Sequence, residues 1–128
     1  MELGKGFCFE ARQKRLRIEG EYFSIDLVFY HRILRCHVLI DLKTRSFKPS
    51  DAGQMNFYLN YFKDNEMCDS DNLPVGIILC TDKKISTVKY ATGSLENQLF
   101  VRSYQVQLPT VKELEEFINR DIKLLAGV

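Results

Sequence analysis

The sequence lacks the features that mark membrane, secreted or repeat proteins. Its apolar runs are far shorter than the roughly 20 residues that a membrane-spanning helix needs, and no signal peptide opens the chain. Internal repeats, low-complexity tracts and linkers are also missing. We therefore predict a single cytoplasmic domain over residues 1–128, long enough to build a core of its own and not associated with a membrane.

Cysteine motifs for metal binding are missing as well. Cys8, Cys36, Cys68 and Cys80 form no CxxC pair and show no Cys/His spacing typical of a zinc site. Reduced thiols in or near the core are therefore favoured over zinc ligands or disulfides.

A strong net charge is the third missing feature. The formal charge is +1, so overall composition does not by itself indicate nucleic-acid binding. The charge is uneven, however: residues 1–50 carry +4 and residues 51–128 carry −3. The first half would offer phosphates a more positive surface, although ordinary solvated charge is the simpler explanation of this asymmetry taken alone.

The first half of the chain predicts three antiparallel strands. Apolar and polar residues alternate from Phe7 to Glu19, and β-branched and aromatic residues dominate from Tyr22 to His31. Cys36 to Lys43 centres on an uninterrupted apolar run, which is typical of a strand covered on both faces. Short turns at 19–21 and 31–35 join the three strands.

The second half predicts a crossover helix and a parallel strand. Ser50 or Asp51 can cap a helix that runs to about Asn65, and Val75–Cys80 is a second buried strand. This order requires a right-handed crossover, so the fold class is α/β, with a central mixed sheet flanked by helices. The other expected elements are a helix end at Gly4 and Gly6, strands at 87–91 and 100–108, and a final helix after Pro109 with a capping box at Thr110–Glu113.

Five polar residues interrupt these apolar patterns: Asp26, Asp41, Lys43, Gln54 and Tyr58. Asp41 and Lys43 are two residues apart, so their side chains share one face of the central strand. Asp26 lies on the adjacent strand, and the helix with Gln54 and Tyr58 starts near the strand end where ligands of α/β sheets bind. Buried charges are costly unless they pair or hold a ligand, so this convergence predicts a functional site.

Two neighbouring carboxylates at this site favour a divalent cation. Without one they repel each other and one pKa rises. Mg²⁺, or Mn²⁺, suits Asp26 and Asp41 because it takes a few carboxylate oxygens and fills its other positions with water and phosphate. Lys43 could then hold the attacking water or the phosphate, and Gln54 could order the site.

Each of these residues has a structural explanation when taken singly. Asp41 and Lys43 could form a surface salt bridge, and Asp26 could lie on a solvated sheet face. Tyr58, an aromatic residue on an amphipathic helix, would more often belong to the core. Together with Gln54, the set favours an active site.

In this order the motifs resemble the PD-(D/E)XK nuclease superfamily. Asp26 follows Ile25, where the superfamily has proline, Asp41-Leu42-Lys43 matches D-x-K, and residues 54–58 resemble the Q-x-x-x-Y element of the RecB-like branch. Residues 20–62 with 74–80 are similar to the nuclease-like C-terminal domain of the bacterial YhcG-type family, and the resemblance covers nearly the entire chain.

The resemblance implies a restriction-endonuclease-like core and a Mg²⁺-dependent DNA endonuclease. It implies a metal held by Asp26 and Asp41 with the Leu42 carbonyl as a further ligand, and catalytic roles for Lys43 and Gln54. Glu2 matches the acidic residue of the superfamily's first helix, and Glu10 is an alternative to it. A separate N-terminal domain is implied too, so we expect residues 1–128 to be excised from a longer protein.

DNA is the predicted partner. The candidate nucleic-acid contacts are Arg12, Lys14, Arg15, Arg45, Lys48 and Tyr58. A homodimer would suit a nuclease that cuts both strands. The alternatives are a catalytically silent nucleic-acid- or protein-binding module with a nuclease-like fold, and a purely structural domain.

Overall fold

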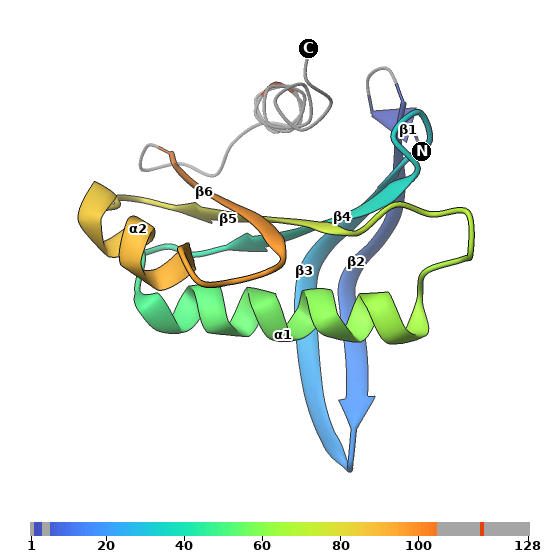
Figure 1. Ribbon diagram of the computed structural model, residues 1–128, viewed down its shortest axis with the longest axis horizontal. Coiled ribbons are helices and arrows are strands. Elements are labelled where there is room, and N and C mark those ends of the chain that lie inside the picture. The colour runs from blue at the N-terminus through green and yellow to red at the C-terminus, as the bar shows by residue number, and fades with distance from the viewer. Residues whose placement is uncertain (1, 4–5, 105–115, 117–128) are drawn as a thin grey trace.

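The computed structural model describes residues 2–3, 6–104 and 116 (Figure 1). In this part of the chain one sheet has the strand order β1-β2-β3-β4-β5-β6 and is accompanied by two helices. The strands are β1 (Glu2–Leu3), β2 (Phe7–Ile18), β3 (Glu21–His31), β4 (Cys36–Leu42), β5 (Val75–Cys80) and β6 (Gln98–Ser103), and the helices are α1 (Pro49–Asn65) and α2 (Ile85–Thr92). No helix among the described residues is long and apolar enough to cross a membrane.

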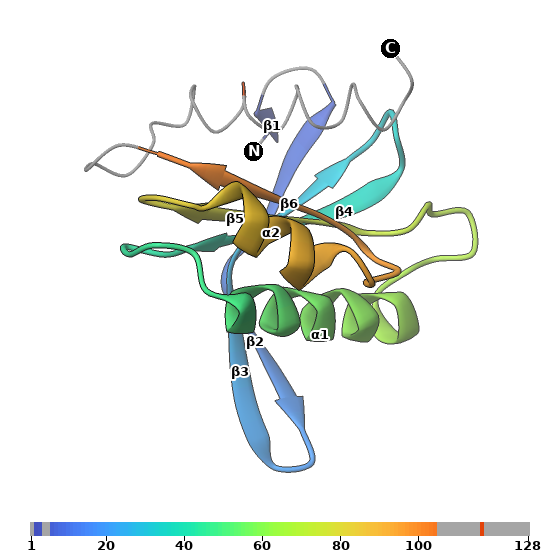
Figure 2. The ribbon, with the colours of Figure 1, turned by 60° about the vertical axis from the view of Figure 1, so that its left-hand side comes forward.

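The sheet is mixed, as the sequence predicts. β2, β3 and β4 pair antiparallel in sequence order, and β5 and β6 then add in parallel to β4. α1 connects β4 to β5 and lies across one face of the sheet (Figures 1 and 2). The antiparallel meander, the crossover helix and the parallel strand are all confirmed.

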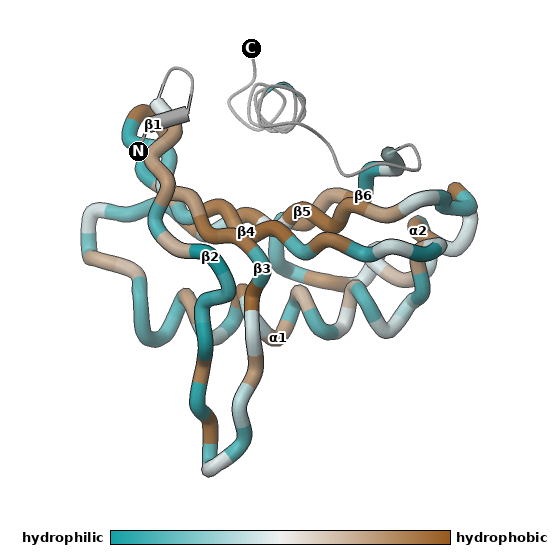
Figure 3. Tube along the Cα trace, turned by 180° about the vertical axis from the view of Figure 1, so that it is seen from behind, coloured by the Kyte–Doolittle hydropathy of each residue, from teal (hydrophilic) through white to brown (hydrophobic). Residues whose placement is uncertain are grey.

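β4 is the centre of two apolar clusters. Val38, Leu39 and Ile40 are fully buried, with Leu39 in the cluster that includes α1 and the other two in the cluster on the opposite face. Figure 3 shows the most hydrophobic stretches of the chain in β4 and β5. The helix approaches β5 so closely that a Cβ atom at Gly76 would lie 2.6 Å from the Met55 side chain. This packing brings the start of α1 against the carboxyl end of β4.

Four elements differ from the prediction. The expected strand at 87–91 is the helix α2, because Val88 and Ala91, three residues apart on one face of the helix, pack against the α1-side cluster. β6 spans Gln98–Ser103, and the predicted continuation to 108 and the final helix, apart from residue 116, lie outside the described residues. Glu2 and Leu3 form a strand rather than the end of a helix.

The fourth difference concerns the start of α1. Lys48 is the N-cap and Pro49 occupies the first turn, where proline is favoured. Asp51, three residues after Lys48, accepts a hydrogen bond from the Lys48 backbone N–H at 2.9 Å. Asp51 therefore closes the first turn from inside the helix instead of capping it from outside.

β2 and β3 are the longest strands, and together they project beyond α1 as a hairpin (Figures 1 and 2). β3 pairs with β4 only as far as Leu27 opposite Ile40. Residues 13–26 therefore form a two-stranded extension, which we call the arm. A β-bulge between Phe9 and Ala11 changes the β2–β3 register before the arm begins.

Candidate active site

The candidate site lies at the fork where β3 separates from β4. Asp26 is the first residue of β3 beyond the last β3–β4 pair, Leu27 opposite Ile40. Its Oδ2 accepts a hydrogen bond from the Leu42 backbone N–H at 2.7 Å. The Asp26 carboxylate thus satisfies a β4 donor that the departing strand no longer pairs.

Asp41 follows Ile40, the last residue of β4 that pairs with β3, and is only 3% exposed. Its Oδ2 is buried and has no hydrogen-bond partner among the described residues. Burial raises the pKa of the carboxyl group to about 6; the charge of Lys43 opposes this rise and the charge of Asp26 adds to it. An ionised Asp41 at neutral pH is therefore a buried anion that lacks full compensation.

Lys43 and Gln54 meet beside this pair. Lys43 Nζ donates a hydrogen bond to Gln54 Oε1 at 2.9 Å, which links the end of β4 to the second turn of α1. The backbone of Lys43 is fixed by its N–H bond to the Leu79 carbonyl at 2.7 Å and by the Tyr104 hydroxyl, which donates to the Lys43 carbonyl at 2.8 Å. The structure thus brings together Asp26, Asp41, Lys43 and Gln54, as the sequence predicts.

Tyr58 faces the same site from α1 but not as a surface residue. It is 2% exposed, and burial, followed by the charges of Asp41 and Asp26, raises its pKa to about 12. Its ring belongs to the α1-side apolar cluster. The prediction that Tyr58 contacts nucleic acid is therefore wrong, because its side chain is a neutral core group behind the carboxylates.

Gln13 and Ser24 join the site without having been predicted. Gln13 Nε2 donates to Asp26 Oδ1 at 3.4 Å, and Ser24 Oγ donates to Gln13 Oε1 at 3.3 Å. Gln13 has a φ of 52°, in the left-handed region that non-glycine residues rarely adopt. The bulge places Gln13 here, because the register before it would set Arg12 opposite Asp26. No local sequence signal announces a bulge at this position.

Neither predicted additional acid reaches the carboxylate pair. Glu2 pairs with Cys8, and Cys8 faces Tyr30, four residues from Asp26 along β3, or about 13 Å of strand. Glu10 lies 3.1 Å from the Nδ1 atom of His37. Assigning Glu2 to this site is therefore wrong, since β1 lies at the other end of the sheet. No cluster of three or more acidic, His or Cys side chains suited to a metal occurs among the described residues.

The predicted phosphate contacts divide into two groups. Arg45 donates to both carboxylate oxygens of Asp51 at 2.7 and 3.0 Å, and Lys14 lies 3.3 Å from Glu66. These two cations thus have carboxylate partners in the fold, and Arg45 in particular stabilises the start of α1. Arg12, Arg15 and Lys48 are exposed, as a phosphate contact requires.

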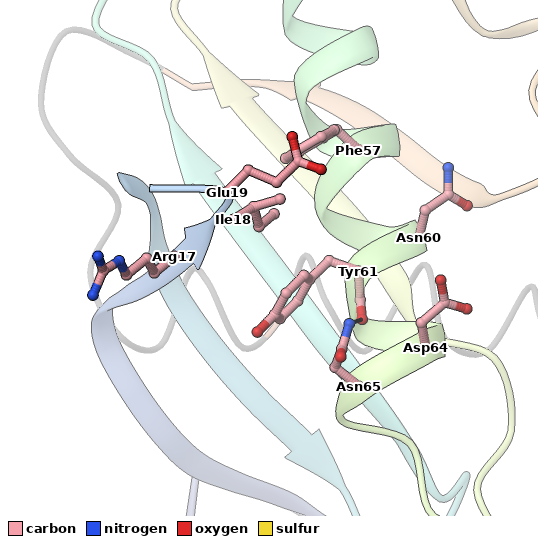
Figure 4. A pocket seen from close by; sticks show the side chains of 8 residues that line it. All are labelled: Arg17, Ile18, Glu19, Phe57, Asn60, Tyr61, Asp64 and Asn65. Carbon is pink, nitrogen blue, oxygen red and sulfur yellow. Dashed lines mark hydrogen bonds between the residues drawn. The ribbon is translucent and has the colours of Figure 1, made fainter. Parts of the chain in front are cut away.

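A separate hollow of about 500 Å³ lies between the tip of the arm and α1 (Figure 4). Ile18 and Glu19 line it from the arm, and Phe57, Tyr61 and Asn60 line it from the helix. None of the four converging residues at the fork belongs to its wall. The candidate chemistry is therefore at the fork and not in this hollow.

Comparisons with known proteins identify the family and the fold of the chain. The sequence profile of the YhcG PDDEXK nuclease domain matches residues 1–119. The chain is 44% identical over 120 residues to a protein of Escherichia coli (strain K12) named "Putative nuclease YhcG". That match covers 94% of this chain and 32% of the relative, so the chain spans about a third of the length of its curated relative.

Solved structures show the same fold. A repair endonuclease from Pyrococcus abyssi has a TM-score of 0.53 and 17% identity over 81% of this chain and 40% of that one. EndoMS in complex with dsDNA has a TM-score of 0.58 and 15% identity over 84% of this chain and 40% of that one. These similarities confirm the predicted restriction-endonuclease-like core. With nearly the full length matched by the family profile, the chain belongs to the YhcG PDDEXK nuclease domain family.

Proposed function

We propose that this domain hydrolyses phosphodiester bonds in DNA with the help of a divalent metal ion, Mg²⁺ or Mn²⁺. The observation that carries the proposal is the buried Oδ2 atom of Asp41, which has no partner among the described residues and lies beside a second carboxylate. Native proteins rarely leave a buried carboxylate oxygen unpaired. A cation between Asp41 and Asp26 would satisfy it.

The residues present fit such an ion. Mg²⁺ commonly binds through one or two carboxylates and keeps water and substrate phosphate in its other positions, so a third carboxylate is not required. Asp26 and Asp41 would hold it, and the Leu42 carbonyl is the adjacent backbone oxygen. When bound, the metal would lower the pKa of a coordinated water and neutralise charge on the phosphate.

Lys43 supplies the cationic side chain of the site. Gln54 Oε1 accepts from its ammonium group and holds it at the end of β4. In hydrolysis the water oxygen bonds to phosphorus, the bond to the leaving ribose oxygen breaks, and that oxygen takes a proton. Lys43 would stabilise the negative charge that builds up on the phosphate oxygens during this exchange.

The relatives support DNA as the substrate class. One similar structure is named a repair endonuclease and another contains dsDNA. Two copies of the chain related by a twofold axis would place one site on each strand, so a homodimer is part of this proposal.

A catalytically silent binding module is the second candidate. It is favoured by the hydrogen bonds that both Asp26 oxygens already accept, from Leu42 and from Gln13. A carboxylate that is committed to the backbone has less freedom to bind metal.

The test combines metal binding and cleavage. We expect isothermal titration to show Mn²⁺ binding to the wild-type domain and a large loss of binding in Asp41→Asn. We also expect the wild type, but not the variant, to nick supercoiled plasmid in Mg²⁺. Equal cleavage by both proteins would contradict the assignment, and DNA binding without metal binding or cleavage would favour the silent module.

A further inference from the structure

One face of the arm carries a continuous row of exposed polar side chains that starts at the candidate site. Because β2 and β3 are in register through the arm, Gln13 lies opposite Asp26, Arg15 is paired with Ser24, and Arg17 is paired with Tyr22. Side chains two residues apart on a strand point to the same face. We call this row, formed by Gln13, Arg15, Arg17, Tyr22 and Ser24, the arginine strip; all five residues are exposed.

The other face of the arm is not available to a partner. Leu16 and Ile25 are 2% and 0% exposed and belong to the apolar cluster under α1. The ring centroid of Phe23 lies 4.9 Å from that of Phe57 on the helix. This packing fixes the arm to α1, so the arginine strip is the side that remains open. Figure 4 shows the Arg17 guanidinium pointing away from the helix.

Tyr22 organises the two arginines of the strip. The Cζ atoms of Arg15 and Arg17 lie 5.1 and 5.6 Å from the centroid of the Tyr22 ring, within the range of cation–π interactions. Neither guanidinium has a carboxylate partner in the described part of the chain, in contrast to Arg45 and Lys14. A guanidinium stacked on a ring keeps its N–H edge free, and that edge matches a phosphate.

We propose that the arginine strip binds the phosphate backbone of duplex DNA on the side of the scissile bond toward which the arm extends. Two neighbouring guanidiniums without carboxylate partners among the described residues, in a row that begins at Asp26, complement a polyanion that must itself reach Asp26 and Asp41. The proposal rests on the proposed nuclease function for the position of the scissile bond, although binding alone tests it.

The spacing sets the scale of the contact. Two residues of strand advance about 6.7 Å, whereas duplex DNA advances about 3.4 Å per nucleotide along its axis. Arg15 is paired two residues and Arg17 four residues beyond Asp26 along β3. The two guanidiniums therefore reach phosphates about two and four nucleotides from the bond held at the fork.

The test is the salt dependence of DNA binding. A fluorescently labelled duplex is titrated with wild type and with Arg15→Gln/Arg17→Gln in EDTA, so that no cleavage intervenes, at several salt concentrations. Loss of two phosphate contacts should reduce the slope of log K against log salt by about 1.8 and weaken binding at least about tenfold at physiological salt. Both side chains are exposed, so circular dichroism should show an unchanged fold.

The matched control removes two positive charges away from the arm. Arg35 precedes β4 at the end opposite the fork, and Lys89 lies in the last turn of α2, which packs against α1, so Arg35→Gln/Lys89→Gln changes net charge equally, away from the strip. Its slope should equal that of the wild type. An equal effect of both double variants would overturn the proposal, since net charge alone would then explain binding, and so would wild-type affinity in the strip variant. Wild-type DNA binding without cleavage in Mg²⁺ would instead contradict only the proposed nuclease function.

Discussion

Each end of β4 carries a buried ionisable side chain, and the two side chains differ in how completely their polar atoms are paired. At the start of the strand, His37 is 7% exposed, and its two ring nitrogens lie 3.1 Å from Glu10 and 3.9 Å from Asp71. Asp71 also accepts from the Tyr30 hydroxyl at 2.5 Å and from the Cys68 backbone N–H at 2.9 Å. At the end of the strand, Asp41 is equally buried but retains an oxygen without a partner among the described residues.

The difference between these ends separates structure from function. Both groups lie on the α1 side of the same strand: the His37 ring centroid is 5.2 Å from that of Phe62, and the charge of Asp41 acts on Tyr58. Burial alone therefore does not distinguish them. A buried polar group whose partners all come from the chain stabilises the fold, whereas one left incomplete is prepared for something that arrives from outside.

The largest expected effect is on cleavage. Asp41→Asn should reduce DNA cleavage in Mg²⁺ by about a thousandfold or more, because the site loses a carboxylate that no other described acid replaces. Asp71→Asn should retain nearly wild-type cleavage at a temperature where it is folded. Plasmid-nicking rates measure both, and equal losses in the two variants would remove the distinction between the ends of β4.

The second effect concerns Lys43. Lys43→Met should lower the cleavage rate by about a hundredfold while leaving Mn²⁺ binding largely intact, since the ammonium group contacts Gln54 and in the proposed reaction would contact the substrate phosphate rather than the metal. Lys43→Arg should recover part of the rate. Single-turnover kinetics measures the cleavage rate, and a separate titration measures Mn²⁺ binding. Loss of metal binding in Lys43→Met would contradict the proposal that Lys43 acts on the substrate and not on the metal.

The third effect is on stability and should have opposite signs at the two ends. The pKa of Asp41 rises from 3.8 to about 6, mainly through burial, which corresponds to about 3 kcal/mol against the folded state at pH 8. Asp41→Asn in EDTA should therefore stabilise the domain by up to that amount. Asp71→Asn should destabilise it by about 1–3 kcal/mol, because it weakens bonds from Tyr30 and Cys68. Urea unfolding measures the change in the free energy of unfolding for both variants. If both variants were destabilised, the expected difference between the two ends of β4 would be wrong.

The pH dependence of stability should separate the same two groups. Because folding raises the pKa of Asp41, the contribution of this group to the free energy of unfolding is fully present below pH 3.8, where its carboxyl group is protonated. This contribution is lost as the pH rises to about 6. Burial opposes the charged form of His37, but the hydrogen bond and charge of Glu10 and the charge of Asp71 raise its pKa above 6.5 overall. The stabilisation of the fold by protonated His37 is therefore present below pH 6.5 and is lost as the pH rises through the raised pKa of the folded state.

Two variants test these windows in EDTA. Asp41→Asn should remove the slope of unfolding free energy between pH 3.8 and 6, and His37→Asn should remove a slope that begins above pH 6.5. A slope above pH 6.5 that survives in His37→Asn would assign it to another group.

The sequence was sufficient to predict features that depend on local pattern, but not features that depend on tertiary contacts. Local pattern was sufficient for β4 and α1, and the D-x-K spacing placed Asp41 and Lys43 on one face, because strand periodicity is a property of the strand itself. α2 was missed because Thr87 and Val88 favour a strand by propensity while tertiary packing selects the helix.

Residue roles that depend on distant contacts were also missed. Arg45 was expected to bind phosphate, yet its carboxylate partner is Asp51 at the start of α1. Gln13 reaches Asp26 only because a bulge shifts the register of β2 by one residue. Such shifts arise from the pairing of two strands, and neither strand shows them alone.

The smallest expected effect concerns the backbone conformation of Gln13 at the candidate site. A non-glycine residue at a φ of 52° costs about 1 kcal/mol or more relative to glycine. Gln13→Gly should therefore gain about 1 kcal/mol of stability, while the loss of the Gln13 amide from Asp26 weakens Mn²⁺ binding and cleavage severalfold.

Glu19→Gly is the control, because Glu19 has a φ of 48° at the hairpin turn, away from the fork. It should gain similar stability with unchanged cleavage. A stability gain with loss of activity in only the first variant would mean that the strain at Gln13 is retained for the site, whereas identical behaviour of the two glycine variants would make Gln13 a structural residue of the arm.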